Sequence, residues 1–530
     1  MTTKTLDPEA KKNALMWLNE PYDENTKSWI KQNLDSNPDL INAAFYRDLE
    51  FGTGGLRGIM GIGSNRMNVY TIRRATQGLA NYLLKTTKNP SVMVGYDGRE
   101  NSRLFAEEVA KVLAASEITC YLFKELRPTP LVSFGVRYKK ATAGIMITAS
   151  HNPPEYNGYK VYWNDGGQVL PPNDIGIIEE VYKLKHLDEI KVGALDSPFV
   201  KPVLEEIDQA YIKALLPLKV LKGPVPVKAL YTSLHGTGIT LMPTLLKAWE
   251  VEGIAYVEKQ CVPDGKFTYA KTPNPEEKAA LEMGIEQMLR EKHDILLATD
   301  PDADRVGVAV IHKGQAALLN GNQIACICLD FLIRELKKQG RLPAKASFIK
   351  TIVTTELFKK IASQEGYYSF DVLTGFKYVA EKIREWEESQ EHEFVFGGEE
   401  SYGYLYGTQT RDKDGLIISA LLCEIAGQAK KAGKTLIDVM EDIYRKYGLY
   451  LEKLASFKFP ETKEGRESIT TSMQNLRQNP PKTLNGQPIV RVDDYMKLES
   501  ADLVSGRKEK LLLEQSDVLV YWMKNGAKVM

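Results

Sequence analysis

The stretch Ala143-Gly-Ile-Met-Ile-Thr-Ala-Ser-His-Asn-Pro-Pro-Glu-Tyr-Asn-Gly-Tyr-Lys160 joins a short apolar run to a polar loop. Its first residues have the length and apolarity of a buried strand, so Ser150 is predicted to stand just past the carboxyl end of that strand. Proteins of the α/β class bind their ligands at this edge of the sheet. Asn157-Gly158 is typical of a turn. The stretch therefore predicts an α/β layer with a polar site at the end of a strand.

Comparable apolar runs recur on both sides of this stretch and alternate with stretches of helical periodicity. Further strands are predicted at 91–95, 227–231, 295–298, 347–353 and 394–396. Helices are predicted at 104–116, 243–250, 276–292 and 323–338. Because strands alternate with helices, we expect α/β layers around mostly parallel sheets. The pattern recurs about three times, which predicts three similar mixed α/β domains.

The two ends of the chain differ from this pattern. Residues 8–50 have helical spacing that starts at a proline. The tail from about Tyr450 has a turn-rich loop at 480–488 and a strand pattern at 516–526, which suggests a smaller α+β domain. The expected division is an N-terminal helical segment (1–44), α/β domains at 45–210, 211–320 and 321–448, and a C-terminal α+β domain (449–530).

The composition argues against several classes of protein. Lys+Arg and Asp+Glu total 69 each over 530 residues, whereas proteins that bind nucleic acid or anionic membranes usually carry a basic excess. The five cysteines are odd in number and widely spaced, so a disulfide framework is not expected. The N-terminus has no apolar signal core, and no apolar run reaches the roughly 18 residues of a membrane span. We expect a cytoplasmic protein without a nucleic-acid or membrane partner.

A second motif, Asp300-Pro-Asp-Ala-Asp-Arg305, lies between two strand-like runs. Its three carboxylates repel one another unless a cation lies between them, and Mg²⁺ prefers oxygen ligands and phosphate partners. A calcium EF-hand would need Gly and Glu where Arg305 and Ile311 stand. A phosphatase of the haloacid-dehalogenase type also has paired aspartates after a strand, but it would leave Ser150 without a role. A solvated polar loop is the remaining alternative.

The serine loop needs a partner for its hydroxyl. A serine hydroxyl is a weak nucleophile that requires a base or a neighbouring charge, and His151 and Lys160 are the candidates within the loop. The alternative is a serine that only caps backbone groups. The motif Gly397-Gly-Glu-Glu-Ser-Tyr-Gly403 offers carboxylate and hydroxyl groups. These suit a polyol, because each sugar hydroxyl needs both a donor and an acceptor; a polar turn is the alternative there.

Near the N-terminus, Gly52-Thr-Gly-Gly-Leu-Arg-Gly58 is rich in glycine. It is not a dinucleotide-binding loop, because Arg57 occupies the third glycine position of GxGxxG and no clear strand precedes it.

These motifs resemble those of the α-D-phosphohexomutases, the family of phosphoglucomutase and phosphomannomutase. Residues 148–160 resemble the phosphoserine loop of that family, and the metal and sugar loops follow in the family's order. The resemblance runs from about residue 45 to the low 400s and more loosely to the end. Details at 157–163 and 397–403 look closest to the branch that contains animal phosphopentomutase and many bacterial phosphoglucomutases. Tyr96-Asp-Gly-Arg99 also resembles a family segment, without an assigned role.

The resemblance implies a role for each motif. It implies that Ser150 carries the phosphoryl group, that Lys160 is a general acid or base for the sugar hydroxyl, and that His151 lines the same site. Arg57 would touch the phosphoserine. The implied Mg²⁺ ligands are Asp300, Asp302, Asp304 and a phosphoserine oxygen of Ser150. The implied substrate-binding residues are Arg305, Gly375, Lys377, Glu399 and Ser401.

The implied activity is reversible phosphoryl transfer between the 1- and 6-positions of a hexose phosphate, with glucose or mannose as the sugar. A sugar 1,6-bisphosphate would serve as intermediate and activator. Because this intermediate must turn round, the domains are expected to surround a central cleft. The alternatives are a phosphopentomutase that acts on ribose or deoxyribose 1-phosphate, a metal-dependent phosphatase, and a non-catalytic binder of sugar phosphates.

One family motif is not found. The fourth domain of the family has a loop resembling Arg-Pro-Ser-Gly-Thr-Glu-Pro that grips the non-transferred phosphate, and no such string occurs in the 530 residues. We therefore expect the C-terminal domain to be truncated before this loop. Catalysis should be weakened, because remote binding energy orients the reacting hydroxyl.

Overall fold

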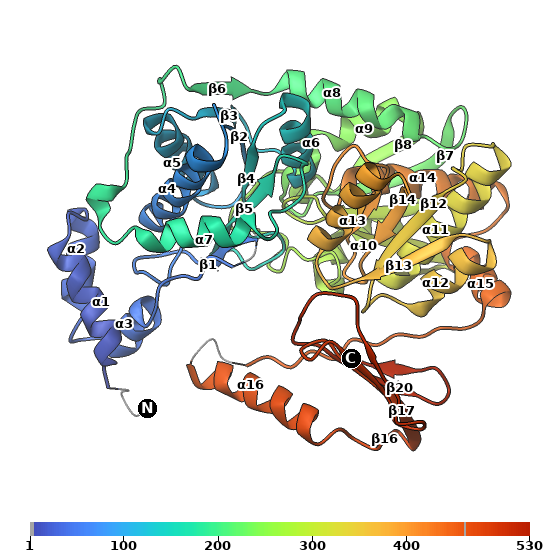
Figure 1. The fold of residues 1–530 in the computed structure, drawn as a ribbon. Coiled ribbons are helices and arrows are strands. Elements are labelled where there is room, and N and C mark those ends of the chain that lie inside the picture. Colours follow the sequence, from blue (N-terminus) through green and yellow to red (C-terminus); the bar gives the residue numbers. More distant parts are fainter. Residues whose placement is uncertain (1–4, 53, 460–462) are drawn as a thin grey trace. The chain divides into compact units, whose positions relative to one another are not determined.

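The computed structural model of the chain describes residues 5–52, 54–459 and 463–530. The chain divides into two compact units (Figure 1). The first comprises Met1–Lys350, Thr354–Phe370 and Phe376–Tyr450, and the second comprises Thr351–Val353, Asp371–Gly375 and Leu451–Met530. Among the described residues, no helix is both long and apolar enough to cross a membrane.

The N-terminal segment forms three helices. They are α1 (Pro8–Asn19), α2 (Glu24–Asn33) and α3 (Pro38–Phe45). Asp7, Asp23 and Asn37 cap them, because each side chain accepts hydrogen bonds from backbone N–H groups of the first turn. Trp17 and Phe45 belong to the small core that the helices share. The helical spacing predicted at 8–50 thus ends at Phe45, and residues 1–4 of the expected segment 1–44 lie outside the described residues.

The first sheet has the strand order β1-β5-β4-β2-β3-β6. Strands β4, β2, β3 and β6 run parallel. At one edge β5 pairs antiparallel with β4, and β1 pairs antiparallel with β5. The strands are β1 (Gly55–Ile59), β2 (Ser91–Tyr96), β3 (Thr119–Phe123), β4 (Ala143–Ile147), β5 (Tyr156–Trp163) and β6 (Val200–Val203). The helices are α4 (Val69–Thr86), α5 (Ser102–Ala115), α6 (Thr129–Lys139), α7 (Asn173–Lys183), η1 (Leu187–Glu189), α8 (Glu205–Leu215) and η2 (Leu216–Leu218).

Helices cover both faces of this sheet. Val92 and Val94 of β2 share a core with Phe105 of α5. Met93 lies in a different core with Leu131 of α6. Because successive strand side chains point to opposite faces, α5 and α6 lie on opposite sides of the sheet. Every residue of β4 is buried, as expected for the central strand of an α/β layer.

The second sheet has the order β11-β10-β9-β7-β8. Strands β9, β7 and β8 are parallel, and β10 turns back antiparallel to β9. The strands are β7 (Val225–Thr232), β8 (Val251–Tyr256), β9 (Ile295–Thr299), β10 (Val306–His312) and β11 (Gln315–Leu319). The helices are η3 (Thr237–Thr240), α9 (Met242–Ala248), η4 (Glu258–Gln260) and α10 (Lys278–Glu291). The connection between β9 and β10 is the motif 300–305, so the aspartates lie in a hairpin turn.

The third sheet has the order β13-β12-β14-β15. Strands β12 and β14 are parallel, and β15 is antiparallel to β14. The strands are β12 (Ala346–Thr351), β13 (Tyr368–Val372), β14 (Glu393–Gly398) and β15 (Tyr404–Tyr406). The helices are α11 (Gly321–Lys338), α12 (Glu356–Gln364), α13 (Phe376–Ser389), α14 (Gly415–Lys431) and α15 (Leu436–Tyr447). Helix α14 is buried along most of its length and packs on β7, β9 and β10 of the second sheet.

The second unit contains an antiparallel sheet of order β19-β18-β17-β20-β21, with β16 paired to β17. Its elements are α16 (Lys463–Gln478), β16 (Thr483–Leu484), β17 (Gln487–Asp494), β18 (Glu499–Asp502), β19 (Lys508–Lys510), β20 (Leu519–Met523) and β21 (Lys528–Val529). Ile489, Leu519 and Tyr521 form its buried core. Strand β20 confirms the strand predicted at 516–526, and the smaller α+β unit is confirmed with it.

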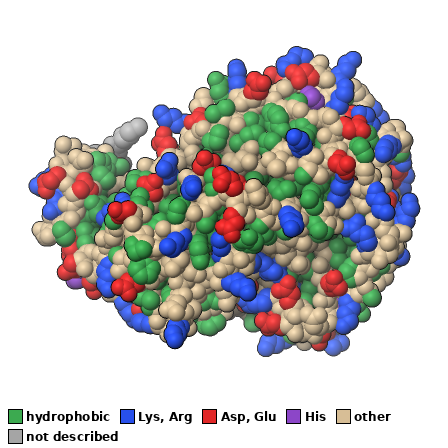
Figure 2. Space-filling model, turned by 90° about the horizontal axis from the view of Figure 1, so that it is seen from above, with side chains coloured by type: hydrophobic (Ala, Val, Ile, Leu, Met, Phe, Trp, Pro, Cys, Tyr) green, Lys and Arg blue, Asp and Glu red, His purple; other side chains and the backbone are tan. Residues whose placement is uncertain are grey.

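The fold class predicted from the sequence is confirmed, because three mixed α/β sheets are followed by a smaller α+β part. On the face that Figure 2 shows, basic and acidic side chains are interspersed. This agrees with the equal totals of 69 residues of each sign.

Candidate functional site

Ser150 lies just beyond the carboxyl end of β4, where the sequence places it. It is buried, and its backbone has φ +52°, in the left-handed region. Its Oγ donates a hydrogen bond to Asp300 Oδ2 at 2.8 Å and lies 3.2 Å from His151 Nδ1. The fold thus brings the serine loop of the first sheet to the aspartate turn of the second sheet, across 150 residues of sequence.

His151 is a neutral imidazole in this environment. Burial, reinforced by the charges of Arg305 and Arg57, lowers the pKa of His151 to about 3. Because the one hydroxyl hydrogen of Ser150 is donated to Asp300, a neutral His151 can hold the oxygen by donating Nδ1–H to it. A group with so low a pKa is also a weak base at neutral pH. His151 is therefore suited to orient the hydroxyl rather than to take its proton.

The aspartate turn forms a cluster of three buried carboxylates. One oxygen from each of Asp300, Asp302 and Asp304 lies within 4.8 Å of the others. Asp300 Oδ1 accepts hydrogen bonds from the backbone N–H groups of Asp304 (3.1 Å) and Arg305 (3.0 Å), which shapes the turn. Burial, reinforced by the negative charges of Asp302 and Asp304, raises the pKa of Asp300 well above its ordinary value.

Two oxygens of this cluster have no hydrogen-bond donor. Asp302 Oδ1 and Asp304 Oδ1 are buried, and no described residue donates a hydrogen bond to either. A buried carboxylate oxygen without a donor is costly unless a cation lies beside it. The three carboxylates therefore fit a hard divalent cation that prefers oxygen ligands.

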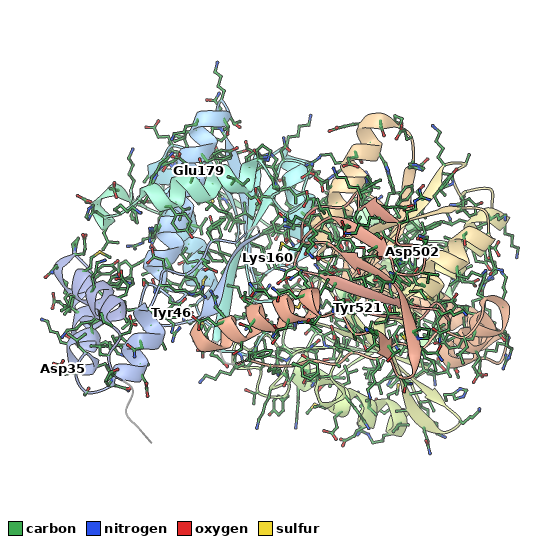
Figure 3. The ribbon with its side chains drawn as sticks, turned by 60° about the horizontal axis from the view of Figure 1, so that its bottom comes forward. Asp35, Tyr46, Lys160, Glu179, Asp502 and Tyr521 are labelled. Carbon is green, nitrogen blue, oxygen red and sulfur yellow. The ribbon has the colours of Figure 1, made fainter. Side chains whose placement is uncertain are left out.

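Lys160 lies on β5, not in a loop (Figure 3). The turn predicted at Asn157-Gly158 is wrong, because both residues belong to β5 and pair with β1. Asn157 is held inside by a hydrogen bond to Ser102 Oγ at 2.9 Å. Gly158 is required by packing, since a Cβ there would lie 2.4 Å from the carbonyl oxygen of Thr148. Close backbone approach, rather than turn chemistry, explains the glycine.

The Lys160 ammonium forms ion pairs with two of the three aspartates. Its Nζ lies 2.7 Å from Asp302 Oδ2 and 3.3 Å from Asp304 Oδ2. Burial works to lower the pKa of Lys160, but Asp302 and Asp304 outweigh it, so the pKa is raised. For Asp302, burial works to raise the pKa, but the charge of Lys160 outweighs it, so the pKa is lowered. Lys160 is thus held as a charged ammonium beside the aspartates.

Lys413 is a second buried cation that the sequence analysis missed. Its Nζ lies 3.1 Å from Asp304 Oδ2 and 2.9 Å from Asp412 Oδ1. Burial works to lower its pKa, but Asp304 and Asp412 raise it well above the ordinary value. The available signal was the run Arg411-Asp-Lys-Asp-Gly415, in which alternating charges directly precede the buried helix α14.

Thr129 also reaches the aspartates and was also missed. It is the first residue of α6, and its Oγ1 donates a hydrogen bond to Asp302 Oδ2 at 2.8 Å. Its backbone N–H donates to the carbonyl oxygen of Asp302, also at 2.8 Å. Nothing in the sequence around Thr129 connects it with a turn 173 residues away.

The loop 397–403 adjoins the aspartate turn through the backbone. Arg305 forms an isolated β-bridge with Gly403, and a Cβ at Gly403 would lie 2.1 Å from Lys413 Cδ. Glu399 is buried, and burial raises its pKa to about 6, although Lys413 works against that shift. Ser401 is half-buried in the turn of the loop. The structure therefore brings Glu399, Arg305 and Lys413 to the same place as the aspartates.

Two predicted arginines occupy different settings. The Arg305 guanidinium forms an ion pair with Glu276, with Nη1 2.8 Å from Oε1. Arg57 is exposed on β1, and its Nη1 lies 3.5 Å from Asn152 Oδ1 of the serine loop. The sequence predicted a loop around Arg57, whereas β1 includes it because residues 55–59 pair with β5.

Gly375 and Lys377 lie at the start of α13. Gly375 has φ +118°, which favours glycine, and the Lys377 ammonium lies 4.9 Å from the centre of the Tyr378 ring. Gly375 belongs to the segment Asp371–Gly375 of the second unit. A substrate contact by Gly375 or Lys377 stays a prediction.

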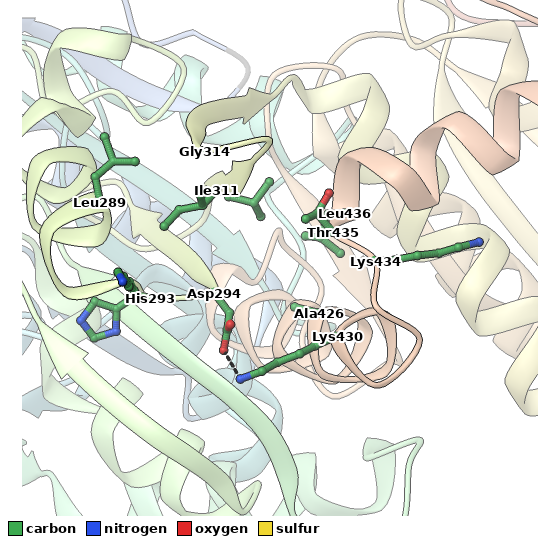
Figure 4. Close-up of a pocket in the computed structure, with 12 residues that line it drawn as sticks. Leu289, His293, Asp294, Ile311, Gly314, Ala426, Lys430, Lys434, Thr435 and Leu436 are labelled. Atoms are coloured by element: carbon green, nitrogen blue, oxygen red, sulfur yellow. Dashed lines mark hydrogen bonds and ion pairs between the residues drawn. The ribbon is translucent and has the colours of Figure 1, made fainter.

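A separate pocket of about 410 Å³ lies beside β10 and α14 (Figure 4). Lys430 on its rim is paired with Asp294, with Nζ 2.7 Å from Oδ2. The described residues that line this pocket include none of those placed around Ser150 and the aspartates.

Models of three domains of one protein family match this chain. The description "Phosphoglucomutase/phosphomannomutase, alpha/beta/alpha domain I" matches residues 48–187. Domain II of the same family matches residues 209–314, and domain III matches residues 320–447.

Curated proteins and solved structures agree with these matches. A phosphoglucomutase of Staphylococcus haemolyticus is 36% identical over 486 residues, which cover 91% of this chain and 87% of that protein. One of Staphylococcus aureus (strain MRSA252) is 36% identical over 512 residues, covering 95% and 90%. The crystal structure of a phosphomannomutase-like protein from Thermus thermophilus has a TM-score of 0.64 and 26% identity, covering 78% of this chain and 89% of that one. Parafusin (phosphoglucomutase) from Paramecium shares the fold, with a TM-score of 0.65, 17% identity and coverage of 91% and 87%.

Proposed function

Because the chain belongs to the phosphoglucomutase/phosphomannomutase family, we propose that it is an isomerase that moves a phosphoryl group between the 1- and 6-positions of a hexose phosphate. The observation that carries this proposal is the buried Ser150 hydroxyl, 2.8 Å from Asp300 in a cluster of three carboxylates. The phosphoglucomutase relatives favour a hexose over a pentose substrate.

We propose a transfer in two steps with Ser150 as the carrier. Phospho-Ser150 gives its phosphoryl group to the free hydroxyl of the sugar monophosphate: the bond from phosphorus to Oγ breaks as the bond to the sugar oxygen forms. The product is a sugar 1,6-bisphosphate. After this intermediate turns round, Ser150 Oγ takes the other phosphoryl group and the isomeric monophosphate leaves. Each step moves one proton from the attacking hydroxyl to the leaving oxygen.

Lys160 is the proposed partner for that proton, because it is a buried ammonium beside the reacting groups. His151 orients the serine hydroxyl as a neutral imidazole that donates Nδ1–H to Oγ. Arg57 is the proposed contact of the phosphoserine, and its Nη1 lies 3.5 Å from Asn152 Oδ1 of the serine loop, which supports this role.

We propose Mg²⁺ as the cation that Asp300, Asp302 and Asp304 hold, with a phosphoserine oxygen of Ser150 as a further ligand. When bound, it would neutralise charge on the transferring phosphoryl group. The two buried carboxylate oxygens without a donor among the described residues support this assignment.

The proposed sugar contacts come from Glu399, Ser401, Arg305, Gly375 and Lys377. A buried carboxylate such as Glu399 can accept hydrogen bonds from ring hydroxyls. We further propose that the partner is a small sugar phosphate, with the bisphosphate as activator, and that the protein works in the cytoplasm. The five cysteines are free thiols, which supports a reducing compartment.

The deciding experiment compares the wild type, Ser150→Ala and the control Ser36→Ala, which removes an exposed hydroxyl on the N-terminal segment. A coupled assay measures turnover of glucose, mannose and ribose 1-phosphates. After incubation with glucose 1,6-bisphosphate, mass spectrometry examines the peptide that contains Ser150. We expect mutase turnover and one added phosphoryl group on that peptide in the wild type and in Ser36→Ala, and neither in Ser150→Ala.

Three other results would contradict the proposal. Normal turnover in Ser150→Ala would remove the serine from the reaction. Steady release of inorganic phosphate from glucose 1-phosphate would indicate a phosphatase. Binding of glucose 6-phosphate with neither turnover nor phosphorylation would indicate a non-catalytic binder.

A further inference from the structure

The turn Asp97–Arg99, which follows β2, lies directly behind the serine loop. Arg99 is 3% exposed, and its guanidinium donates to four carbonyl oxygens of that loop. Nη1 donates to Pro153 (2.8 Å) and Tyr156 (3.1 Å), and Nη2 donates to Ser150 and Asn152. Four backbone carbonyl groups therefore accept hydrogen bonds from one guanidinium, whose donors have a fixed planar geometry.

A closed ring of contacts links Arg99 to both backbone groups of Ser150. The Ser150 N–H donates to Thr148 Oγ1 at 2.8 Å, and that hydroxyl donates to Asp97 Oδ2 at 2.6 Å. The same Asp97 Oδ2 lies 3.3 Å from Arg99 Nε. Since Arg99 also binds the Ser150 carbonyl, the amide and the carbonyl of the serine are both tied to Asp97.

Ser150 needs such support, because its φ of +52° is unfavourable for a residue with a Cβ. Backbone conformations of this kind persist only where the surrounding contacts determine them. The conformation has a consequence for chemistry, since it aims Oγ at Asp300.

Arg99 does not line the side of the loop that carries the Ser150 hydroxyl. Its guanidinium lies 4.9 Å from the centre of the buried Phe267 ring. A Cβ at Gly265 would lie 2.5 Å from the backbone nitrogen of Glu100, so this segment packs closely on the Arg99 turn. Both Nη atoms donate to the loop and Nε lies in ion-pair range of Asp97, so Arg99 acts through Ser150 rather than on a ligand.

We propose that Arg99 is a positioning residue that holds the serine loop in the conformation that presents Ser150 Oγ to Asp300. The consequence for phosphoryl transfer rests on the proposed function. The effect of Arg99 on the conformation of the serine loop does not depend on the proposed function, and hydrogen exchange can measure it separately.

The test uses Arg99→Lys, which keeps the charge but loses the planar fork, beside Arg103→Lys as the matched control. Arg103 lies on α5 and is exposed. Its Nε forms a surface ion pair with Glu107 Oε1 at 3.0 Å. Hydrogen exchange is followed for the peptide 148–156, in which the amides of Ser150, Asn152 and Tyr156 bond within the loop. We expect faster exchange there in Arg99→Lys only, with β2, β4 and residues 157–163 of β5 unchanged.

For turnover, we expect kcat of Arg99→Lys to fall about 100-fold with KM unchanged, because displacing a reacting group by roughly 1 Å costs this much. Wild-type exchange at 148–156 in Arg99→Lys would overturn the proposal, and so would equal acceleration in all peptides. If Arg99→Lys does not fold, Thr148→Val opens the same ring from its other side and carries the same expectations.

The two proposals fail in different ways. If neither the wild type nor Arg103→Lys shows turnover, the proposed function fails while the exchange of peptide 148–156 still decides the role of Arg99. If both turn over and Arg99→Lys matches them in kcat, the positioning role fails while the proposed function stands.

Discussion

At the scale of single residues, ion pairs between buried lysines and aspartates stabilise the site. Lys160 and Lys413 both approach Asp304, and Lys160 also approaches Asp302. A buried charge without a partner costs several kcal/mol, so this arrangement is stable only as a set. The three aspartates alone would suggest an anionic pocket. The lysines bring the cluster close to neutrality.

The first prediction concerns the pH dependence of substrate binding. Burial raises the pKa of Glu399 to about 6, so its carboxylate is ionised above this pH and protonated below it. An ionised carboxylate accepts hydrogen bonds from sugar hydroxyls at both oxygens, whereas a protonated one must donate at one of them. We expect KM for glucose 1-phosphate to rise roughly tenfold per pH unit below pH 6.

The matched variant for this prediction is Glu399→Gln, which cannot titrate. Its KM should be higher than that of the wild type at pH 8 and nearly constant down to pH 5. Titration of the substrate phosphate affects both proteins equally, so the difference between the two curves reports Glu399. Parallel curves would show that Glu399 is not the titrating group.

The second prediction concerns Thr129. Its hydroxyl donates to Asp302 Oδ2, which leaves Oδ1 of the same carboxylate for a cation. Groups that orient a metal ligand typically contribute 10- to 100-fold to metal affinity. We expect Thr129→Val to weaken Mn²⁺ binding by about 10-fold or more in a calorimetric titration. The control is Thr86→Val on the exposed face of α4, which should bind Mn²⁺ with wild-type affinity. If Thr129→Val also binds Mn²⁺ with wild-type affinity, Thr129 does not orient Asp302.

At the scale of elements, local patterns predicted strands and helices well. The runs at 143–148, 227–231 and 295–298 are confirmed as β4, β7 and β9, because each is largely apolar and, except for Lys228 of β7, buried. The pattern failed at Asn157-Gly158, which has the composition of a turn but lies in β5. Turn residues report a local preference, and here a buried hydrogen bond and a close backbone contact override it.

The third prediction tests that close contact. In Gly158→Ala the added Cβ would lie 2.4 Å from the Thr148 carbonyl oxygen and 2.9 Å from that of Leu56. Overpacking of this kind costs about 1–3 kcal/mol, so the urea midpoint should fall. In the control Gly52→Ala the nearest atom is 3.8 Å away, and the midpoint should stay near that of the wild type. An unchanged midpoint for Gly158→Ala would mean that β5 moves aside at little cost.

At the scale of the whole molecule, the longest stretch of the second unit, Leu451–Met530, begins with an extended segment. Residues 451–459 have no helix or strand, and Leu454 and Phe457 are 80% and 84% exposed. Exposed segments without regular structure are the preferred sites of proteolysis. The boundary near residue 449, like those near 44, 210 and 320, stays a prediction from the sequence.

The fourth prediction is that chymotrypsin first cuts within 451–459. Mass spectrometry should find one fragment that ends there and a smaller C-terminal one. The double variant Leu454→Ala/Phe457→Ala should slow this cut, since it removes two preferred side chains. First cuts near residues 215–219 or 321 would place the weakest boundary between the α/β domains instead.

Local sequence patterns were enough to predict the α/β class, the smaller α+β end, the strand that precedes Ser150 and the turn that carries the aspartates. These features follow from hydrophobic periodicity and residue chemistry within a few neighbouring positions. The folded chain, and no local pattern, shows that Ser150 contacts Asp300 across 150 residues and that Lys160 contacts Asp302 across 142. It also shows that Thr129, Lys413 and Arg99 stand around them. Such contacts depend on which strand edges the chain crossovers bring together, and no local pattern records that choice.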